Sequence, residues 1–114
     1  MDDSTTLILA LTTEADEPQA EALARDLLER RLVACVSFIP VRSVYSWEGT
    51  IQRASEVQLL LKTSPRCLGA LHRAVMELHS YDTPEWLSWP VQSSEAYGLW
   101  ALAAVNSDGM PQDR

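Results

Sequence analysis

The most constraining feature of the sequence is a pair of long extended runs that meet at Glu48-Gly49. The first run reads VACVSFIPVRSVYSW and the second IQRASEVQLLLKT, so residues 33–63 predict two long strands. An acidic residue followed by glycine favours a tight hairpin turn. Pro40 cannot donate a hydrogen bond to the neighbouring strand, and we expect it to mark a bulge or bend.

The length of this hairpin predicts contact with another subunit. Arms of about 14 residues at about 3.3 Å each would span about 46 Å, whereas a domain of this size has a radius of gyration of about 13 Å. The apolar residues of the first strand point the same way, because Leu7, Leu9 and Leu11 alternate with Ile8 and Ala10. Burying one such side chain contributes roughly 1.5–3 kcal/mol, so a bare sheet face would be costly. The sequence therefore predicts a homo-oligomer.

The segments around the hairpin complete an alternating pattern of strands and helices. Their order predicts an α+β fold of the ferredoxin-like type, βαββαβ, with an added C-terminal helix. Right-handed crossovers would place both long helices on one face of an antiparallel sheet. Ser94 is expected to cap the closing helix. The expected parts are an N-terminal tail (1–5), one domain (6–105) with strands at 6–13 and 83–91 and helices at 17–31 and 65–79, and a mobile C-terminal tail (106–114).

Charge and cysteine content exclude several classes of function. The net charge of −7 repels phosphate backbones, so neither nucleic acid nor an anionic membrane is an expected partner. The two cysteines form no CxxC motif, which indicates a reducing compartment, and no apolar run approaches the roughly 20 residues of a membrane span. A cytoplasmic protein is expected. No recognisable catalytic motif occurs, so an enzyme is not predicted.

The segment LHSYDTPEW, residues 78–86, holds the best candidates for metal binding. His79 and Glu85, joined by Asp82, supply the imidazole and carboxylate groups that suit copper or zinc. His72 precedes His79 by seven residues on the same expected helix, about 10.5 Å along the axis, which is too far for the two to share an ion. The structural alternative is that His79 caps the helix and the Thr-Pro step opens the last strand.

Several of these motifs together resemble the CutA family, also called divalent cation tolerance proteins. They are RRLVACVSFIPVRSVYSWEGTIQRASEVQLLLKT, LHSYDTPEWLSWPV and the closing pair Tyr97 and Trp100. The resemblance implies a homotrimer with PII-like architecture, a long hairpin that engages neighbouring subunits, and a role in tolerance to divalent metals, notably copper (Cu²⁺). Of the copper ligands proposed in the family, Glu85 is present, whereas Thr12 and Leu78 occupy the positions of a cysteine and a histidine. Ser80 replaces the proline of the usual HPYDTPE.

Aromatic and basic residues predict a second kind of site, in a cleft between subunits. Tyr45, Trp47, Tyr81 and Trp86 would form its walls, and Lys62 would attract an anion. The alternative is that these aromatic side chains form the core of the subunit interface. Two functions therefore stay open: a trimeric metal-tolerance protein, and a PII-like signalling or scaffold trimer that binds a small anionic metabolite or a partner protein.

Overall fold

The computed structural model describes residues 5–105 and confirms the expected α+β fold. The predicted tails 1–5 and 106–114 lie outside this range except for Thr5. The elements are β1 (Thr5–Glu14), α1 (Glu17–Glu29), β2 (Cys35–Trp47), β3 (Thr50–Thr63), a 3₁₀ turn η1 (Pro65–Cys67), α2 (Leu68–Leu78), β4 (Leu87–Ser93) and α3 (Glu95–Ala104).

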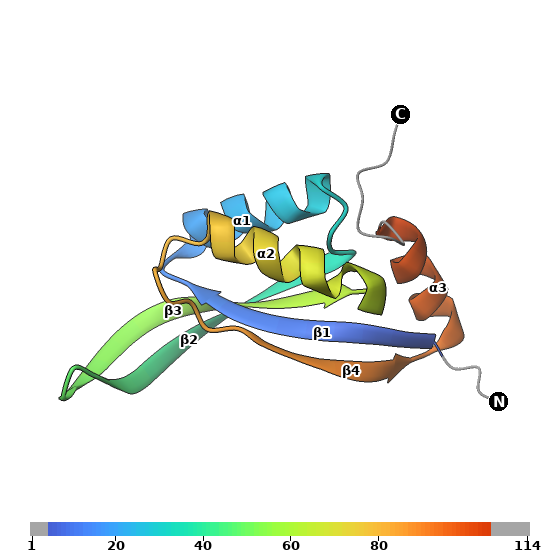
Figure 1. Cartoon of the computed structure of the whole chain (residues 1–114). Coiled ribbons are helices and arrows are strands. Elements are labelled where there is room, and N and C mark those ends of the chain that lie inside the picture. Colours follow the sequence, from blue (N-terminus) through green and yellow to red (C-terminus); the bar gives the residue numbers. More distant parts are fainter. Residues whose placement is uncertain (1–4, 106–114) are drawn as a thin grey trace.

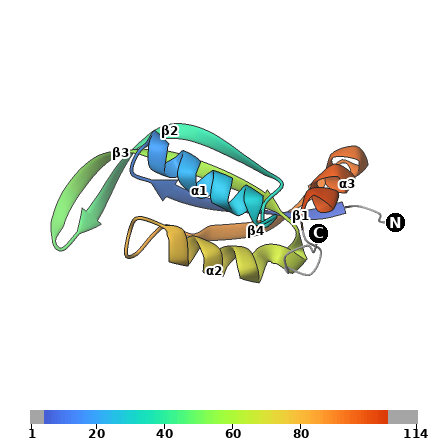
Figure 2. The ribbon, with the colours of Figure 1, turned by 90° about the horizontal axis from the view of Figure 1, so that it is seen from above.

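The four strands form one antiparallel sheet in the order β2-β3-β1-β4. Helices α1 and α2 lie side by side on one face of the sheet, and α3 lies at the end where β1 begins and β4 finishes (Figures 1 and 2). This is the ferredoxin-like arrangement that the element order predicts. No helix within residues 5–105 has the length and apolar character needed to cross a bilayer.

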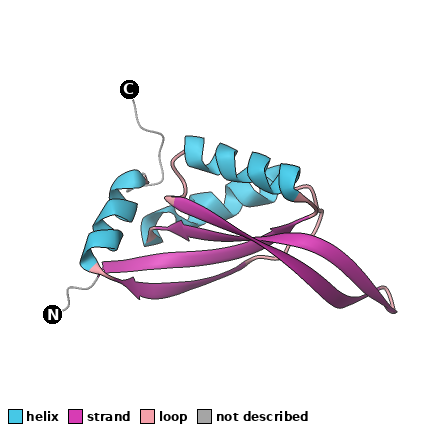
Figure 3. Cartoon of the chain, turned by 180° about the vertical axis from the view of Figure 1, so that it is seen from behind, coloured by secondary structure: helices cyan, strands magenta, loops and turns pink. Residues whose placement is uncertain are grey.

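The hairpin of β2 and β3 forms as predicted and projects beyond the helical layer (Figures 1 and 3). Its register is unbroken from Cys35 opposite Lys62 to Trp47 opposite Thr50. The two loop residues are left-handed, with φ of 51° at Glu48 and 82° at Gly49, as a two-residue type I′ turn requires. The molecule is consequently elongated, measuring 49 × 34 × 20 Å.

Of the bulge or bend expected at Pro40, the bulge is wrong, because Pro40 pairs directly with Val57 in the continuous register. The physical reason is the sheet order: β2 is an edge strand, where a residue without an N–H is tolerated. The last strand also differs from prediction. It begins at Leu87 rather than residue 83, and the residues before it form an irregular loop.

Side chains that cap the helices fix where they begin. The Asp16 carboxylate accepts the Gln19 N–H at 3.0 Å at the start of α1. The Ser94 hydroxyl accepts the Tyr97 N–H at 3.2 Å at the start of α3, which confirms the predicted cap. Such caps satisfy backbone donors that the first turn leaves unpaired.

The main core lies between the two long helices and the sheet. Leu23 and Leu27 of α1, and Leu71 and Val75 of α2, pack on the buried side chains of β3. These β3 residues are Val57, Leu59 and Leu61, which alternate along the strand and so share one face. The other face carries Leu9, Leu11, Leu60, Leu87 and Trp89, which the register places in adjacent rows. Within residues 5–105, no helix covers the middle of that face (Figures 1 and 3).

Gly98 is expected to be irreplaceable at the contact between α3 and the sheet. A Cβ added there would lie 2.3 Å from Ser93 Oγ and 2.4 Å from Thr5 Cγ2, far inside normal contact distance. Overpacking of this kind costs about 1–3 kcal/mol. We expect Gly98→Ala to lower the free energy of unfolding by that amount in a denaturant titration.

The matched control is Gly69→Ala in α2, where the added Cβ would lie 3.7 Å from Arg73 Nη1, an ordinary contact distance. This variant should be neutral or stabilising, by up to about 1 kcal/mol, because alanine is the better helix former. Equal effects of the two substitutions would contradict the proposed role of Gly98.

Candidate functional site

The centre of the candidate site is a buried contact between the end of β1 and the loop that follows α2. The side chains of His79 and Glu14 are 0% and 2% exposed, and His79 Nδ1 lies 3.4 Å from Glu14 Oε2. His79 occupies the C-cap position of α2, where its backbone N–H donates to the Val75 carbonyl. The loop is thereby tied to both the helix and the sheet.

The hydrogen bonds of His79 define a neutral ring. Nε2 lies 2.6 Å from the Thr13 carbonyl oxygen, which can only accept, so Nε2 carries the proton. Nδ1 accepts the backbone N–H of Tyr81 at 3.0 Å, so it carries none. The contact with Glu14 is therefore not an ion pair. The predicted capping role is met by the backbone of His79, while its ring bridges β1 and the loop.

The Glu14 carboxylate accepts three hydrogen bonds from its surroundings. Oε2 accepts the Ser80 N–H at 3.1 Å, and Oε1 accepts the Ser80 hydroxyl at 2.5 Å and the Ala15 N–H at 3.1 Å. A buried carboxylate needs such donors to offset the loss of its water shell. Ser80, which departs from the proline usual in the family, thus supplies two donors to a buried acid.

Tyr81 extends this network onto the hairpin. Its hydroxyl donates to Glu56 Oε2 at 2.7 Å. Burial, then the hydrogen bond and the charge of Glu56, raise the pKa of Tyr81 above its ordinary value. The phenol therefore stays protonated, and it holds the loop after α2 against β3. Glu56 thus has its hydrogen-bond partner within the same chain.

The residues predicted to bind metal are only partly brought together. His79 is buried with both ring nitrogens in hydrogen bonds, whereas Asp82 and Glu85 are exposed on the same loop. Across residues 5–105, no three His, Cys, Asp or Glu side chains are grouped closely enough to hold an ion. Thr12, at the position of the family cysteine, is fully buried and its hydroxyl lacks a partner in the described structure.

The residues predicted to line a cleft are spread over three places in one subunit. Tyr45 and Trp47 are exposed near the tip of the hairpin. Lys62 lies at the other end of β3, about 40 Å from the tip for a 12-residue separation, where its Nζ donates to Ser37 Oγ at 2.6 Å. Trp86 stacks on His72, with ring centroids 4.9 Å apart and planes 8° from parallel. A shared cleft would require residues from more than one subunit.

Sequence reasoning missed Glu14 and Glu56, the two acids of the network. Glu14 directly follows the apolar segment TLILALTT. An acidic residue at the end of an apolar strand is a pattern that could have indicated a buried carboxylate. Nothing in the sequence pairs it with Ser80, which lies 66 residues away. Glu56 precedes the apolar Val57 in the alternating pattern of β3, so the sequence gives it the appearance of an ordinary solvent-facing strand residue.

The chain is similar in sequence to proteins of a known family. The family model for the CutA1 divalent ion tolerance protein matches residues 8–104, from β1 to the end of α3. A protein named divalent-cation tolerance protein CutA, from Pectobacterium atrosepticum, is 41% identical over 100 residues, which cover 86% of this chain and 91% of that protein.

Two solved structures show the same fold. CutA from Synechococcus elongatus aligns with a TM-score of 0.87 and 38% identity, covering 92% of this chain and 95% of its own. The protein from Archaeoglobus fulgidus, described as a periplasmic divalent cation tolerance protein CutA, aligns with a TM-score of 0.85 and 30% identity, covering 88% and 99%.

Proposed function

Because the chain belongs to the CutA1 family of divalent ion tolerance proteins, we propose that it serves divalent cation tolerance as a homotrimer of PII-like architecture. In this assembly the hairpin of one subunit covers the bare sheet face of another. Copper and other divalent cations are the proposed ligands, bound weakly at the surface of the assembled protein.

The observation that carries the assembly is the apolar surface left open in one subunit. Large hydrophobic side chains are exposed on the hairpin, on β4 and on α3, in three separate parts of the fold. Exposed apolar surface of this extent is typical of protein interfaces. These exposed residues include Tyr45, Trp47, Leu87, Trp89, Leu99 and Trp100.

The proposed cation contact lies on the loop between α2 and β4. Asp82 and Glu85 present exposed carboxylates, the ligand type that divalent ions accept. His79 would become a ligand only if Nδ1 gave up the Tyr81 N–H. We therefore assign His79 a positioning role, in which it anchors the loop that carries the two acids. Two carboxylates with water as the remaining ligands would give weak and exchangeable binding.

Calorimetric titration with Cu²⁺ and with Zn²⁺ tests this assignment. We expect binding weaker than about 1 μM for the intact protein, and a loss of at least about tenfold in affinity for Asp82→Ala and Glu85→Ala. The matched control is Glu29→Ala, which removes an exposed carboxylate from α1. Equal affinity in all four proteins would contradict the site. So would the lack of any detectable binding to the intact protein at metal concentrations up to about 10 mM.

The cysteines support a reducing compartment, and we propose the cytoplasm. Cys35 and Cys67 are not joined by a disulfide bond, and Cys67 is buried. A protein of an oxidising compartment more often pairs its cysteines. The Archaeoglobus fulgidus relative is described as periplasmic, so cell fractionation would distinguish the two locations for this chain.

A further inference from the structure

One face of the hairpin carries two arginines that the proposed function leaves unused. Arg42 of β2 pairs with Ser55 of β3, and Arg53 pairs with Val44. Because side chains alternate along a strand, Arg42 and Arg53 project from the same face of the ribbon. Their positions are diagonal across the two strands, about 7–8 Å apart, which lets long side chains meet.

This face is the one that continues into the helix-covered side of the sheet. On β3, Arg53 and Ser55 precede the core residue Val57 by four and two residues, so all three side chains project from the same face. Tyr45 and Lys62 project from the opposite face, so this is not the cleft predicted from the sequence. The hairpin thus has an aromatic face and an arginine face.

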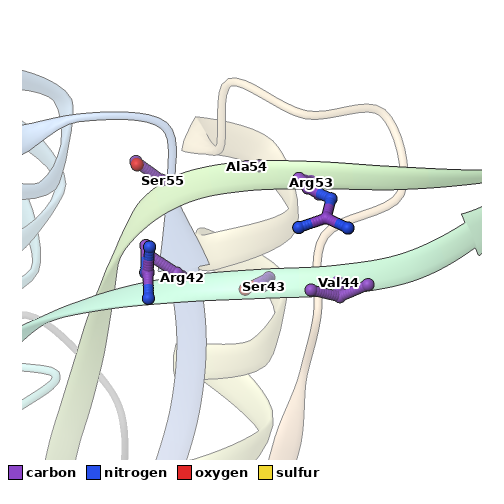
Figure 4. Close-up of a pocket in the computed structure, with 6 residues that line it drawn as sticks. All are labelled: Arg42, Ser43, Val44, Arg53, Ala54 and Ser55. Atoms are coloured by element: carbon purple, nitrogen blue, oxygen red, sulfur yellow. The ribbon is translucent and has the colours of Figure 1, made fainter.

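The arginine face is hollowed. A depression of about 520 Å³ lies over the two strands, lined by Arg42, Ser43, Val44, Arg53, Ala54 and Ser55 (Figure 4). In Figure 4 the Arg42 side chain projects from β2 and the Arg53 side chain from the neighbouring strand β3. Its volume is sufficient for a small phosphorylated or polycarboxylate molecule.

Neither guanidinium is neutralised by the surrounding residues. Within residues 5–105, the ion pairs of arginine involve Arg25 and Arg30, and Arg42 and Arg53 make neither an ion pair nor a side-chain hydrogen bond. The carboxylate nearest in sequence to them, Glu56, is on the other face and accepts the Tyr81 hydroxyl. In a chain with a net charge of −7, two adjacent unpaired cations are a local reversal of charge.

We propose that the arginine face of the hairpin binds an oxyanion, a phosphate or carboxylate group held between Arg42 and Arg53. Guanidinium groups bind such anions through paired, charge-assisted hydrogen bonds. The Ser55 hydroxyl, on the same face as Arg42, adds a neutral donor. All of these groups come from one chain.

The test is calorimetric titration of the full-length protein with sodium pyrophosphate and, separately, with sodium citrate, at constant ionic strength in a chloride buffer. We expect at least one of the two anions to bind. Arg42→Gln and Arg53→Gln should each lower its affinity by about tenfold or more, the loss expected for one charge-assisted hydrogen bond. The matched control Arg73→Gln, an exposed arginine on α2, should leave binding unchanged.

The two probes identify the chemistry of the ligand. Preference for pyrophosphate indicates a phosphate group and preference for citrate a carboxylate, and either supports the site if the two hairpin variants lose it. Circular dichroism of each variant verifies that it is folded.

Two results would overturn the proposal. The first is binding of neither anion up to about 10 mM. The second is binding that both hairpin variants retain. If Arg42→Gln and Arg53→Gln instead dissociate the protein in light scattering while no anion binds, the arginines contact carboxylates of a second copy and the proposal fails.

Discussion

Replacing Glu14 by alanine is expected to destabilise the fold by roughly 3 kcal/mol or more. Three donors now satisfied by its carboxylate, the Ser80 N–H, the Ser80 hydroxyl and the Ala15 N–H, would lose their acceptor. A hydrogen bond to a charged group contributes about 1.5–3 kcal/mol, and the cavity left by the buried Glu14 side chain adds to the cost. Denaturant unfolding followed by circular dichroism measures the difference.

Two further variants separate the network from the size of the side chain. Glu14→Gln keeps the volume and one acceptor oxygen, so it should cost less than alanine. Glu17→Ala removes an exposed acid from the first turn of α1 and should change stability by less than about 1 kcal/mol. If Glu14→Ala were as mild as Glu17→Ala, the hydrogen bonds to Ser80 would contribute little, and the loop would be held by its apolar contacts alone.

Loss of the Glu14 carboxylate should destabilise the loop after α2 more than it destabilises the core. Glu14 and the ring of His79 are the two groups of β1 and α2 that fasten residues 79–81. Hydrogen exchange would show this as faster exchange of the Ser80 and Tyr81 amides at a denaturant concentration that leaves the core folded. The exposed acids Asp82 and Glu85 follow directly, so the same variant should weaken any cation contact at the loop.

The order of the elements could be predicted from the sequence because it rests on local patterns. The helices show apolar residues at helical spacing, and the tight turn has the Glu48-Gly49 pair that left-handed backbone requires. Topology then followed from handedness and short connections. The exceptions are local as well. A bulge or bend was expected at Pro40, and the bulge is absent from the register, because the pattern alone does not show that β2 is an edge strand.

The candidate site could not be predicted to the same extent because its contacts are long-range. Glu14 and Ser80 are 66 residues apart, and Glu56 and Tyr81 are 25 apart. Single residues within these segments carry ordinary signals, an acid after a strand or a tyrosine in a loop. Only the fold brings them within hydrogen-bond distance. The sequence therefore located the loop 79–86 and missed the acids that fix it.

Replacing both Tyr45 and Trp47 by serine is expected to dissociate the proposed trimer into monomers. The two side chains share one face of the hairpin, which continues into the bare face of the sheet, and they are 45% and 54% exposed in the single subunit. Aromatic residues of this kind are the usual hot spots of interfaces, with losses of about 2 kcal/mol or more each. Light scattering at micromolar concentration should change from three times the chain mass of 12.7 kDa to one.

The matched control for this variant is Ile51→Ser, which lies at the same end of the hairpin on the arginine face. Ile51 is 74% exposed, so its replacement removes apolar surface without touching the aromatic face. We expect Ile51→Ser to leave the mass of the assembly unchanged, because the uncovered sheet face of a neighbouring subunit can contact only one face of the hairpin. Dissociation by Ile51→Ser with retention of the trimer in the double variant would reverse the assignment of the two faces. A wild-type protein that is monomeric at this concentration would refute the trimer itself, and the apolar residues of β1 and β4 would then need another partner to cover them.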